Sequence, residues 1–133
     1  MQQTELREQA RLVRWSHLTA SRELMPELRW LHHSPNGGRR DGFTGAQMKA
    51  LGCKAGFPDL ILPVRQPGSL GSIPGLVIEM KTATGRTSTD QDAWLDLFEN
   101  SGWVTALARS ADEARGILCR YLAVDPANAP PLP

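Results

Sequence analysis

The sequence is poor in cysteine, in aromatic residues and in net charge. Cys53 and Cys119 are the only cysteines and lie far apart, so we expect free thiols in a reducing compartment rather than a disulfide or a zinc site. A net charge of +1 argues against non-specific coating of a polyanion but allows a local basic patch. No apolar run approaches the roughly 20 residues of a membrane helix. The polar N-terminus shows no secretory signal, and we expect a cytoplasmic protein without a membrane partner.

The composition that remains is that of one ordinary globular domain. Of the 133 residues, 41% are apolar and 22% are charged, which fits a single core. We expect that domain to cover residues 1–123. Residues 124–133 are rich in proline with few apolar anchors and are expected to form a disordered tail.

Hydrophobic periodicity and turn residues predict an α/β fold in which helices flank a mixed central sheet. The expected order is helix, strand, short helix, strand, strand, helix, strand, helix. Residues 65–74 have the composition of a hairpin loop. Capping boxes starting at Ser88 and Ser110 mark the last two helices. The other expected elements are a helix over 4–19, a strand over 28–33, a helix over 44–51, and strands over 60–64, 76–81 and 103–108.

The first predicted helix places polar residues near its apolar side. Leu6, Ala10 and Val13 form the expected inner stripe, and Gln9 falls inside the same arc. Glu5 lies at the edge of that arc and Glu8 points further round. The helix alone favours a solvated first turn in which the helix dipole stabilises Glu5.

Ionisable residues stand in two predicted strands that should otherwise be uniformly apolar. Asp59 opens the strand over 60–64, and Glu79 and Lys81 lie in the strand over 76–81. A buried carboxylate costs several kcal/mol unless it is paired or bound to a cation. Glu79 and Lys81 are two residues apart and share one face. If the strands pair, both carboxylates and the ammonium meet at one end of the sheet.

This grouping suits Mg²⁺ or Mn²⁺, which take oxygen ligands and often only one or two carboxylates from a protein. Asp59 and Glu79 provide those carboxylates, and the Met80 backbone carbonyl could add an oxygen. Lys81 would stabilise developing charge or the attacking hydroxide, which predicts metal-assisted phosphodiester hydrolysis. A buried ion pair between Lys81 and either carboxylate, binding nothing, is the structural alternative. The placement of Asp59 after Pro58 at a strand start favours the metal site.

With these residues identified, the chain resembles the PD-(D/E)XK nucleases, and among them the VRR-NUC domain of virus-type replication and repair nucleases. It is similar to the stand-alone type of phages and bacteria. The resemblance extends over nearly the whole chain and keeps the order and spacing of the family. It is carried by residues 35–38, 51–52, 54–60, 75–81 and 85–86, with Ser88, Gln91 and Gly102.

The resemblance implies a restriction-endonuclease-like core with Asp59 and Glu79 as metal ligands and Lys81 as the catalytic lysine. It also implies an acidic residue on the first helix, for which we favour Glu5 and keep Glu8 as the alternative metal ligand. Gln91 would act in the site, in the capping box, or in both. The family commonly has a smaller residue where this chain has Phe57, a departure that spares the ligands but bears on substrate access.

The charge distribution fits DNA binding beside this site. Basic residues outnumber acidic ones over residues 36–65, whereas the helix that follows Ser88 carries acidic residues and no base, so we expect it to face away from DNA. Two glycines next to two arginines would allow close approach to phosphate. The expected DNA contacts are Asn36, Gly37, Gly38, Arg39, Arg40, Lys49, Lys54 and Arg86.

The resemblance therefore implies a Mg²⁺- or Mn²⁺-dependent DNA endonuclease without an organic cofactor, in a bacterial or phage-infected cell. Stand-alone members resemble junction-resolving enzymes, so we expect a homodimer that acts on branched or Holliday-junction DNA in repair. Two alternatives remain open: a non-catalytic DNA-binding or accessory protein on the same fold, and a restriction-type site-specific endonuclease.

Overall fold

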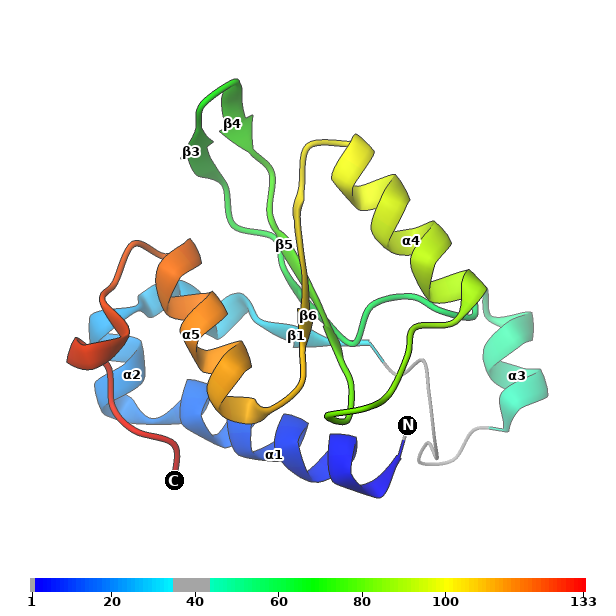
Figure 1. Cartoon of the computed structure of the whole chain (residues 1–133), viewed down its shortest axis with the longest axis horizontal. Helices are drawn as coiled ribbons and strands as arrows, with labels where there is room; N and C mark the ends of the chain where they lie inside the picture. The colour runs from blue at the N-terminus through cyan, green and yellow to red at the C-terminus, as the bar shows by residue number, and fades with distance from the viewer. Residues whose placement is uncertain (1, 35–43) are drawn as a thin grey trace.

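A four-stranded mixed sheet with the order β1-β2-β5-β6 organises the chain (Figure 1). The computed structural model describes residues 2–34 and 44–133. β1 (His32–His33) and β2 (Leu60–Leu62) are antiparallel, as are β2 and β5 (Leu76–Met80). β5 and β6 (Val104–Ala108) are parallel, because helix α4 (Thr89–Asn100) carries the chain back between them. The predicted α/β class with a mixed sheet flanked by helices is confirmed.

The remaining elements surround this sheet, and most of them follow the prediction. Residues 65–74 form a small ribbon of two antiparallel strands that projects away from the main sheet (Figure 1). None of the helices in the described part of the chain is long and apolar enough to cross a membrane. The elements are α1 (Gln3–His17), α2 (Thr19–Leu24), the 3-10 helix η1 (Pro26–Trp30), α3 (Gly45–Ala50), β3 (Gln66–Gly68), β4 (Gly71–Ile73), α5 (Ala111–Tyr121) and the 3-10 helix η2 (Pro126–Asn128).

The core lies between one face of the sheet and the helices α1 and α5. Alternate residues of β5 enter it, and Ile78 and Leu76 pair with Leu60 and Leu62 of β2. Trp15 of α1 is fully buried against this face. Each large apolar side chain buried in this way contributes about 1.5–3 kcal/mol. By contrast, α4, whose Gln91 contacts Glu79 on the other face of the sheet, has no fully buried residue.

Polar caps fix where the helices begin. The predicted capping box of α4 is present: Ser88 Oγ accepts from the Gln91 amide, and Gln91 Oε1 accepts from the Ser88 amide. At α5, only half of the predicted capping box is present among the described residues: Ser110 Oγ accepts from the Glu113 amide, but Glu113 does not accept from the Ser110 amide. There the Ala111 amide donates to Glu8 Oε1 at 3.0 Å, so a side chain of α1 completes the start of α5.

The strand predicted over residues 28–33 is wrong for all but its last two residues. Pro26 opens the 3-10 helix η1, in which the amide of Leu28 donates to the carbonyl of Met25 and that of Leu31 to the carbonyl of Leu28. Leu28 is buried and Leu31 packs against the core, whereas Trp30 is 58% exposed. The apolar spacing was therefore that of a 3-10 turn, three residues apart, and resembled strand alternation by coincidence.

The inner stripe of α1 also differs from the predicted one. Leu6 is 49% exposed, while Leu12 and Trp15 are fully buried, so the stripe is rotated toward the residues that were expected only to flank it. This rotation brings Glu5 and Gln9 inward.

The C-terminal segment is not a disordered tail in the structure. Residues 126–128 form η2, and Ala129 is buried in the core. Arg115 donates to the carbonyls of Pro126, Ala129 and Pro130, and Trp15 Nε1 donates to the Pro130 carbonyl at 2.8 Å. The segment is held because its backbone carbonyls accept hydrogen bonds from the Arg115 guanidinium and the Trp15 indole. The pattern of apolar residues in the sequence does not reveal such hydrogen bonds.

Candidate active site

The strand register brings Asp59 and Glu79 together at one end of the sheet. β2 and β5 pair Leu60 with Ile78, so one further step along the antiparallel register places Asp59 opposite Glu79. Asp59 Oδ2 accepts a hydrogen bond from the Met80 amide at 2.8 Å. Asp59 is 6% exposed and Glu79 is 2% exposed, so both carboxyl groups are largely removed from water. The convergence expected from strand pairing is present.

The Glu79 carboxyl is strongly perturbed by this position. The pKa of Glu79 is raised from 4.5 to about 9, chiefly by burial. The hydrogen bond with Asp59 and the charges of Asp59 and Glu5 add to this rise, and the charge of Lys81 opposes it. Glu79 Oε2 is buried and has no hydrogen-bond partner among the described residues. Without a cation, the protein therefore holds this carboxyl protonated at neutral pH.

Gln91 links the start of α4 to the carboxylate pair. Its Oε1 accepts from the Ser88 amide at 2.8 Å, and its Nε2 donates to Glu79 Oε1 at 3.2 Å. The sequence left open whether Gln91 acts in the capping box, in the site, or in both. Its side-chain amide does both, with the oxygen in the capping box and the nitrogen on Glu79. The capping box thus fixes the amide that touches Glu79.

Helix α1 directs Glu5 and Glu8 to different places. Glu5 is 6% exposed and lies close enough to Glu79 for its charge to raise the pKa of that carboxyl. The Glu8 carboxylate accepts from the Ala111 amide and from Arg11 Nη1, the latter at 3.2 Å. The geometry therefore directs Glu5 toward the site and Glu8 toward the start of α5.

Lys81 is half-buried just past β5, and its charge lowers the pKa of Glu79. The one ion pair in residues 2–34 and 44–133 joins Arg11 to Glu8, so Lys81 is not closed into an ion pair with either carboxylate. The structural alternative of a sealed ion pair is therefore not observed. Lys81 is held through its backbone, since its amide donates to the Ala108 carbonyl at 2.9 Å.

Arg109 supports the segment after Lys81 and was not anticipated from the sequence. Its Nη1 donates to the carbonyls of Thr82 at 2.8 Å and Gly85 at 2.7 Å. A Cβ on Gly85 would come within 2.7 Å of Thr82 Oγ1, so this turn is tightly closed. Nothing in a lone arginine after a strand signals such a role.

A second unanticipated group joins α1 to β1 beside Asp59. Gln9 is 7% exposed, and its Nε2 lies 2.6 Å from His33 Nδ1. The same His33 nitrogen lies 3.3 Å from the Asp59 carbonyl. Gln9 Oε1 is buried and has no partner in the described residues. The helical periodicity already placed Gln9 on the inner side of the first helix. Its partner, His33, could not be predicted because the fold alone brings the two residues together.

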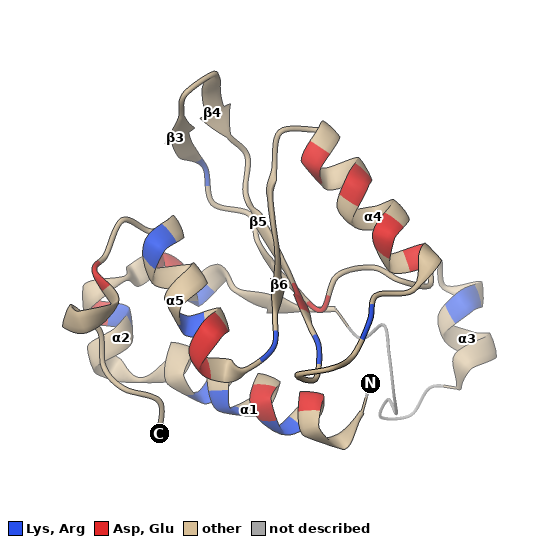
Figure 2. Cartoon of the chain, in the orientation of Figure 1, with Lys and Arg blue, Asp and Glu red and all other residues tan. Residues whose placement is uncertain are grey.

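Three of the eight residues expected to contact DNA lie in the described part of the chain. Lys49 on α3, Lys54 before β2 and Arg86 before α4 are exposed. Asn36, Gly37, Gly38, Arg39 and Arg40 lie outside the described residues. Figure 2 shows acidic bands along α4 without a basic one, and the expectation that this helix faces away from DNA stays a prediction.

The residues present fit a divalent cation that needs few protein ligands. In the described ranges, no group of three His, Cys, Asp or Glu side chains is arranged to hold a metal, so a closed cage is not formed. Mg²⁺ and Mn²⁺ accept one or two carboxylates and complete their shell with water and phosphate. Asp59 and Glu79 provide such a pair, and Glu79 Oε2, which has no hydrogen-bond partner in the described residues, is available to a cation.

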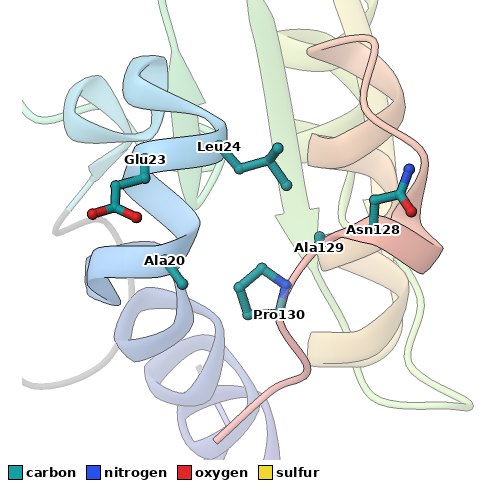
Figure 3. A pocket seen from close by; sticks show the side chains of 6 residues that line it. All are labelled: Ala20, Glu23, Leu24, Asn128, Ala129 and Pro130. Carbon is teal, nitrogen blue, oxygen red and sulfur yellow. The ribbon is translucent and has the colours of Figure 1, made fainter.

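A separate hollow of about 510 Å³ lies between α2 and the C-terminal segment (Figure 3). Its one ionisable lining side chain is Glu23, so it offers no paired carboxylates. The hollow is lined by Ala20, Glu23, Leu24, Asn128, Ala129 and Pro130.

Comparison with known proteins agrees with this architecture. A sequence model described as the VRR-NUC domain matches residues 1–112. A solved structure described as a VRR_NUC domain protein shares the fold with a TM-score of 0.70 at 23% identity, over 93% of this chain and 92% of that one. No curated protein matches the sequence.

Proposed function

The chain belongs to the VRR-NUC domain family, which points to a nuclease, and from this premise we propose that it is a divalent-metal-dependent endonuclease acting on DNA. The observation that carries the proposal is the buried Asp59–Glu79 pair, in which Glu79 Oε2 has no hydrogen-bond partner among the described residues. A carboxyl whose pKa is raised to about 9, chiefly by burial, beside a second buried carboxyl is typical of active sites.

Asp59, Glu79 and the Met80 carbonyl would hold the cation, which we expect to be Mg²⁺ or Mn²⁺. When bound, it would supply a nucleophilic hydroxide and Lewis-acid stabilisation of the phosphate. Asp59 is already fixed for this role by the hydrogen bond from the Met80 amide.

The surrounding side chains would act on the substrate and on the carboxylates. Lys81, which forms no ion pair with another described residue, would stabilise negative charge that develops on the phosphate or on the attacking oxygen. Gln91 Nε2 would orient Glu79 through their hydrogen bond. Glu5, on the site side of α1, would complete the negative environment that retains the cation.

We extend the proposal to branched or Holliday-junction DNA cut by a homodimer in repair. It rests on the resemblance to stand-alone members of the family, because two active sites in one dimer can make paired cuts. The exposed cations Lys49, Lys54 and Arg86 support DNA as the partner, with affinity that falls as salt rises. The free thiols of Cys53 and Cys119 support the expected reducing compartment.

The test is to incubate the purified protein with four-way junctions and with linear duplex, in Mg²⁺, Mn²⁺ or EDTA. We expect cleavage with metal only, faster on junctions, and lost in Asp59→Ala and Lys81→Ala. Asp96→Ala, an exposed acid on α4, is the matched control and should cleave as the wild type does.

Cleavage that persists in EDTA or in Asp59→Ala would contradict the metal mechanism. Binding of DNA without any cleavage would support the accessory-protein alternative. A monomer by light scattering at micromolar concentration would remove the paired cuts.

A further inference from the structure

A pocket of about 250 Å³ opens between the segment that precedes β2 and the first turns of α4. It combines two aromatic rings, a thiol, an ammonium group and backbone from two loops. Its lining residues are Ser34, Gly52, Cys53, Lys54, Phe57 and Trp94.

The aromatic wall of the pocket is held in a defined geometry. The rings of Phe57 and Trp94 meet edge to face, with centroids 4.9 Å apart and planes at 70°. Trp94 Nε1 donates to the Ala55 carbonyl at 3.1 Å, which fixes the indole. A Cβ on Gly56 would come within 2.5 Å of the Asp90 carbonyl carbon, so the loop packs directly on α4. Fixed aromatic rings are a surface of the kind on which a planar group stacks.

Two contacts link the pocket to the residues of the carboxylate pair. Ser34 lines it, and the Ser34 amide donates to the Asp59 carbonyl at 2.9 Å. Trp94 lies one helical turn after Gln91, about 4.5 Å along the axis of α4. Gln91 in turn contacts Glu79. A group seated on Trp94 would therefore lie next to a phosphate positioned at Asp59 and Glu79.

We propose that this pocket binds an unpaired nucleobase of the DNA strand next to the cleaved phosphodiester, with the base stacked on Trp94 and its phosphate contacted by Lys54. The proposal rests on the nuclease function proposed above. An aromatic face suits any base, and an exposed lysine suits the attached phosphate. A base inside a duplex is covered on both faces and cannot reach the wall of a pocket. The enzyme should therefore prefer DNA with an unpaired nucleotide at the cut.

Binding can be measured without cleavage by adding EDTA to the wild-type protein. The probes are two duplexes with 2-aminopurine at the same position, unpaired in one and paired in the other. We expect the unpaired probe to bind more tightly and its fluorescence to be quenched by stacking. Trp94→Leu should weaken binding of the unpaired probe roughly 5- to 150-fold, and of the paired probe far less.

Two variants separate stacking from general damage. Trp94→Phe keeps an aromatic face and should retain most of the preference, with circular dichroism to check the fold. Trp30→Leu removes a tryptophan that is 58% exposed and outside the pocket, and should leave both affinities unchanged. The proposal is overturned if a folded Trp94→Leu keeps the preference, or if the wild type shows none.

Alkylation of Cys53 gives a second readout on the unmodified chain. Cys53 is half-buried in the pocket, whereas Cys119 is buried in the core, so iodoacetamide should label Cys53 first. The unpaired probe should slow this labelling several-fold more than the paired probe at equal occupancy, and equal protection would count against the pocket. Absence of metal-dependent cleavage would instead refute the proposed function, because neither binding assay depends on cleavage.

Discussion

Both ends of α1 contain buried residues, but those residues are polar toward the N-terminal end and mainly apolar toward the C-terminal end. Toward its C-terminal end, Leu12 and Trp15 are fully buried, and the one polar atom of Trp15 is bonded to the Pro130 carbonyl. Toward its N-terminal end, the buried residues are Glu5 and Gln9, and Gln9 Oε1 has no partner in the described chain.

This difference distinguishes the residues of α1 that stabilise the fold, Leu12 and Trp15, from those that shape the proposed active site, Glu5 and Gln9. A buried polar atom without a partner costs about 1–3 kcal/mol. Of the three such atoms in the described residues, Gln9 Oε1 and Glu79 Oε2 belong to the carboxylate end, and Ser21 Oγ on α2 is unexplained by the structure. The N-terminal half of α1 thus lowers stability where it shapes a site, and the C-terminal half compensates by dense apolar packing.

The largest expected effect lies at the folding end. Trp15→Ala should lower the free energy of unfolding by about 3–5 kcal/mol, because the indole is fully buried and its removal leaves a cavity. Urea unfolding followed by circular dichroism measures this. Trp30→Ala, at a tryptophan that is 58% exposed, should change stability by about 0.5 kcal/mol or less. A loss below about 1 kcal/mol in Trp15→Ala would contradict the assignment of this end to stability.

The next effect lies at the carboxylate end and depends on pH. The folded Glu79 has a pKa of about 9 against an ordinary value of 4.5, so between these values the folded state holds a proton that the unfolded state releases. The stability due to this carboxyl is therefore complete below pH 4.5 and is lost as pH rises toward 9. In metal-free buffer, wild type should lose up to about 1.4 kcal/mol per pH unit relative to Glu79→Gln.

Addition of Mg²⁺ sharpens the same experiment. A cation that binds the ionised pair should restore the stability of the wild type at pH 8, by about 2.7 kcal/mol at a hundredfold excess over its dissociation constant. Glu79→Gln, which lacks the charge, should gain much less. Parallel pH profiles for the two proteins in metal-free buffer would refute the buried-acid description of Glu79.

Local patterning predicted more of this molecule than long-range contacts did. The pairing of Asp59 with Glu79 followed from the spacing of two strands, and the position of Gln91 followed from a capping box. The ordered C-terminal segment did not follow, because it depends on Arg115 donating to carbonyls distant in sequence. The Gln9–His33 contact was missed for the same reason, since it joins residues brought together only by the sheet.

A smaller effect should distinguish the two glutamates of α1. Glu5→Ala should reduce the cleavage rate roughly 10- to 100-fold, as loss of a group beside metal ligands commonly does, with little loss of stability. Glu8→Ala should leave cleavage nearly intact and lower stability by about 1 kcal/mol, because the Ala111 amide loses its acceptor. Initial rates on a junction substrate and urea unfolding of both variants test this. The opposite pattern would make Glu8 the residue of the site.

The smallest effect, at Gln9, tests whether the buried polar end of α1 is retained at a cost. Gln9→Leu removes an amide oxygen that has no partner in the described chain, and should raise stability by up to about 1 kcal/mol. It also releases His33, which lies between Gln9 and the Asp59 carbonyl, so the cleavage rate should fall several-fold. Gln3→Leu, on the exposed side of the same helix, is the matched control. Higher stability with slower cleavage in Gln9→Leu, and neither change in Gln3→Leu, would mean that this end of α1 is selected for chemistry. An unchanged cleavage rate in Gln9→Leu would mean that Gln9 has no role in the site and is only an imperfectly packed core residue.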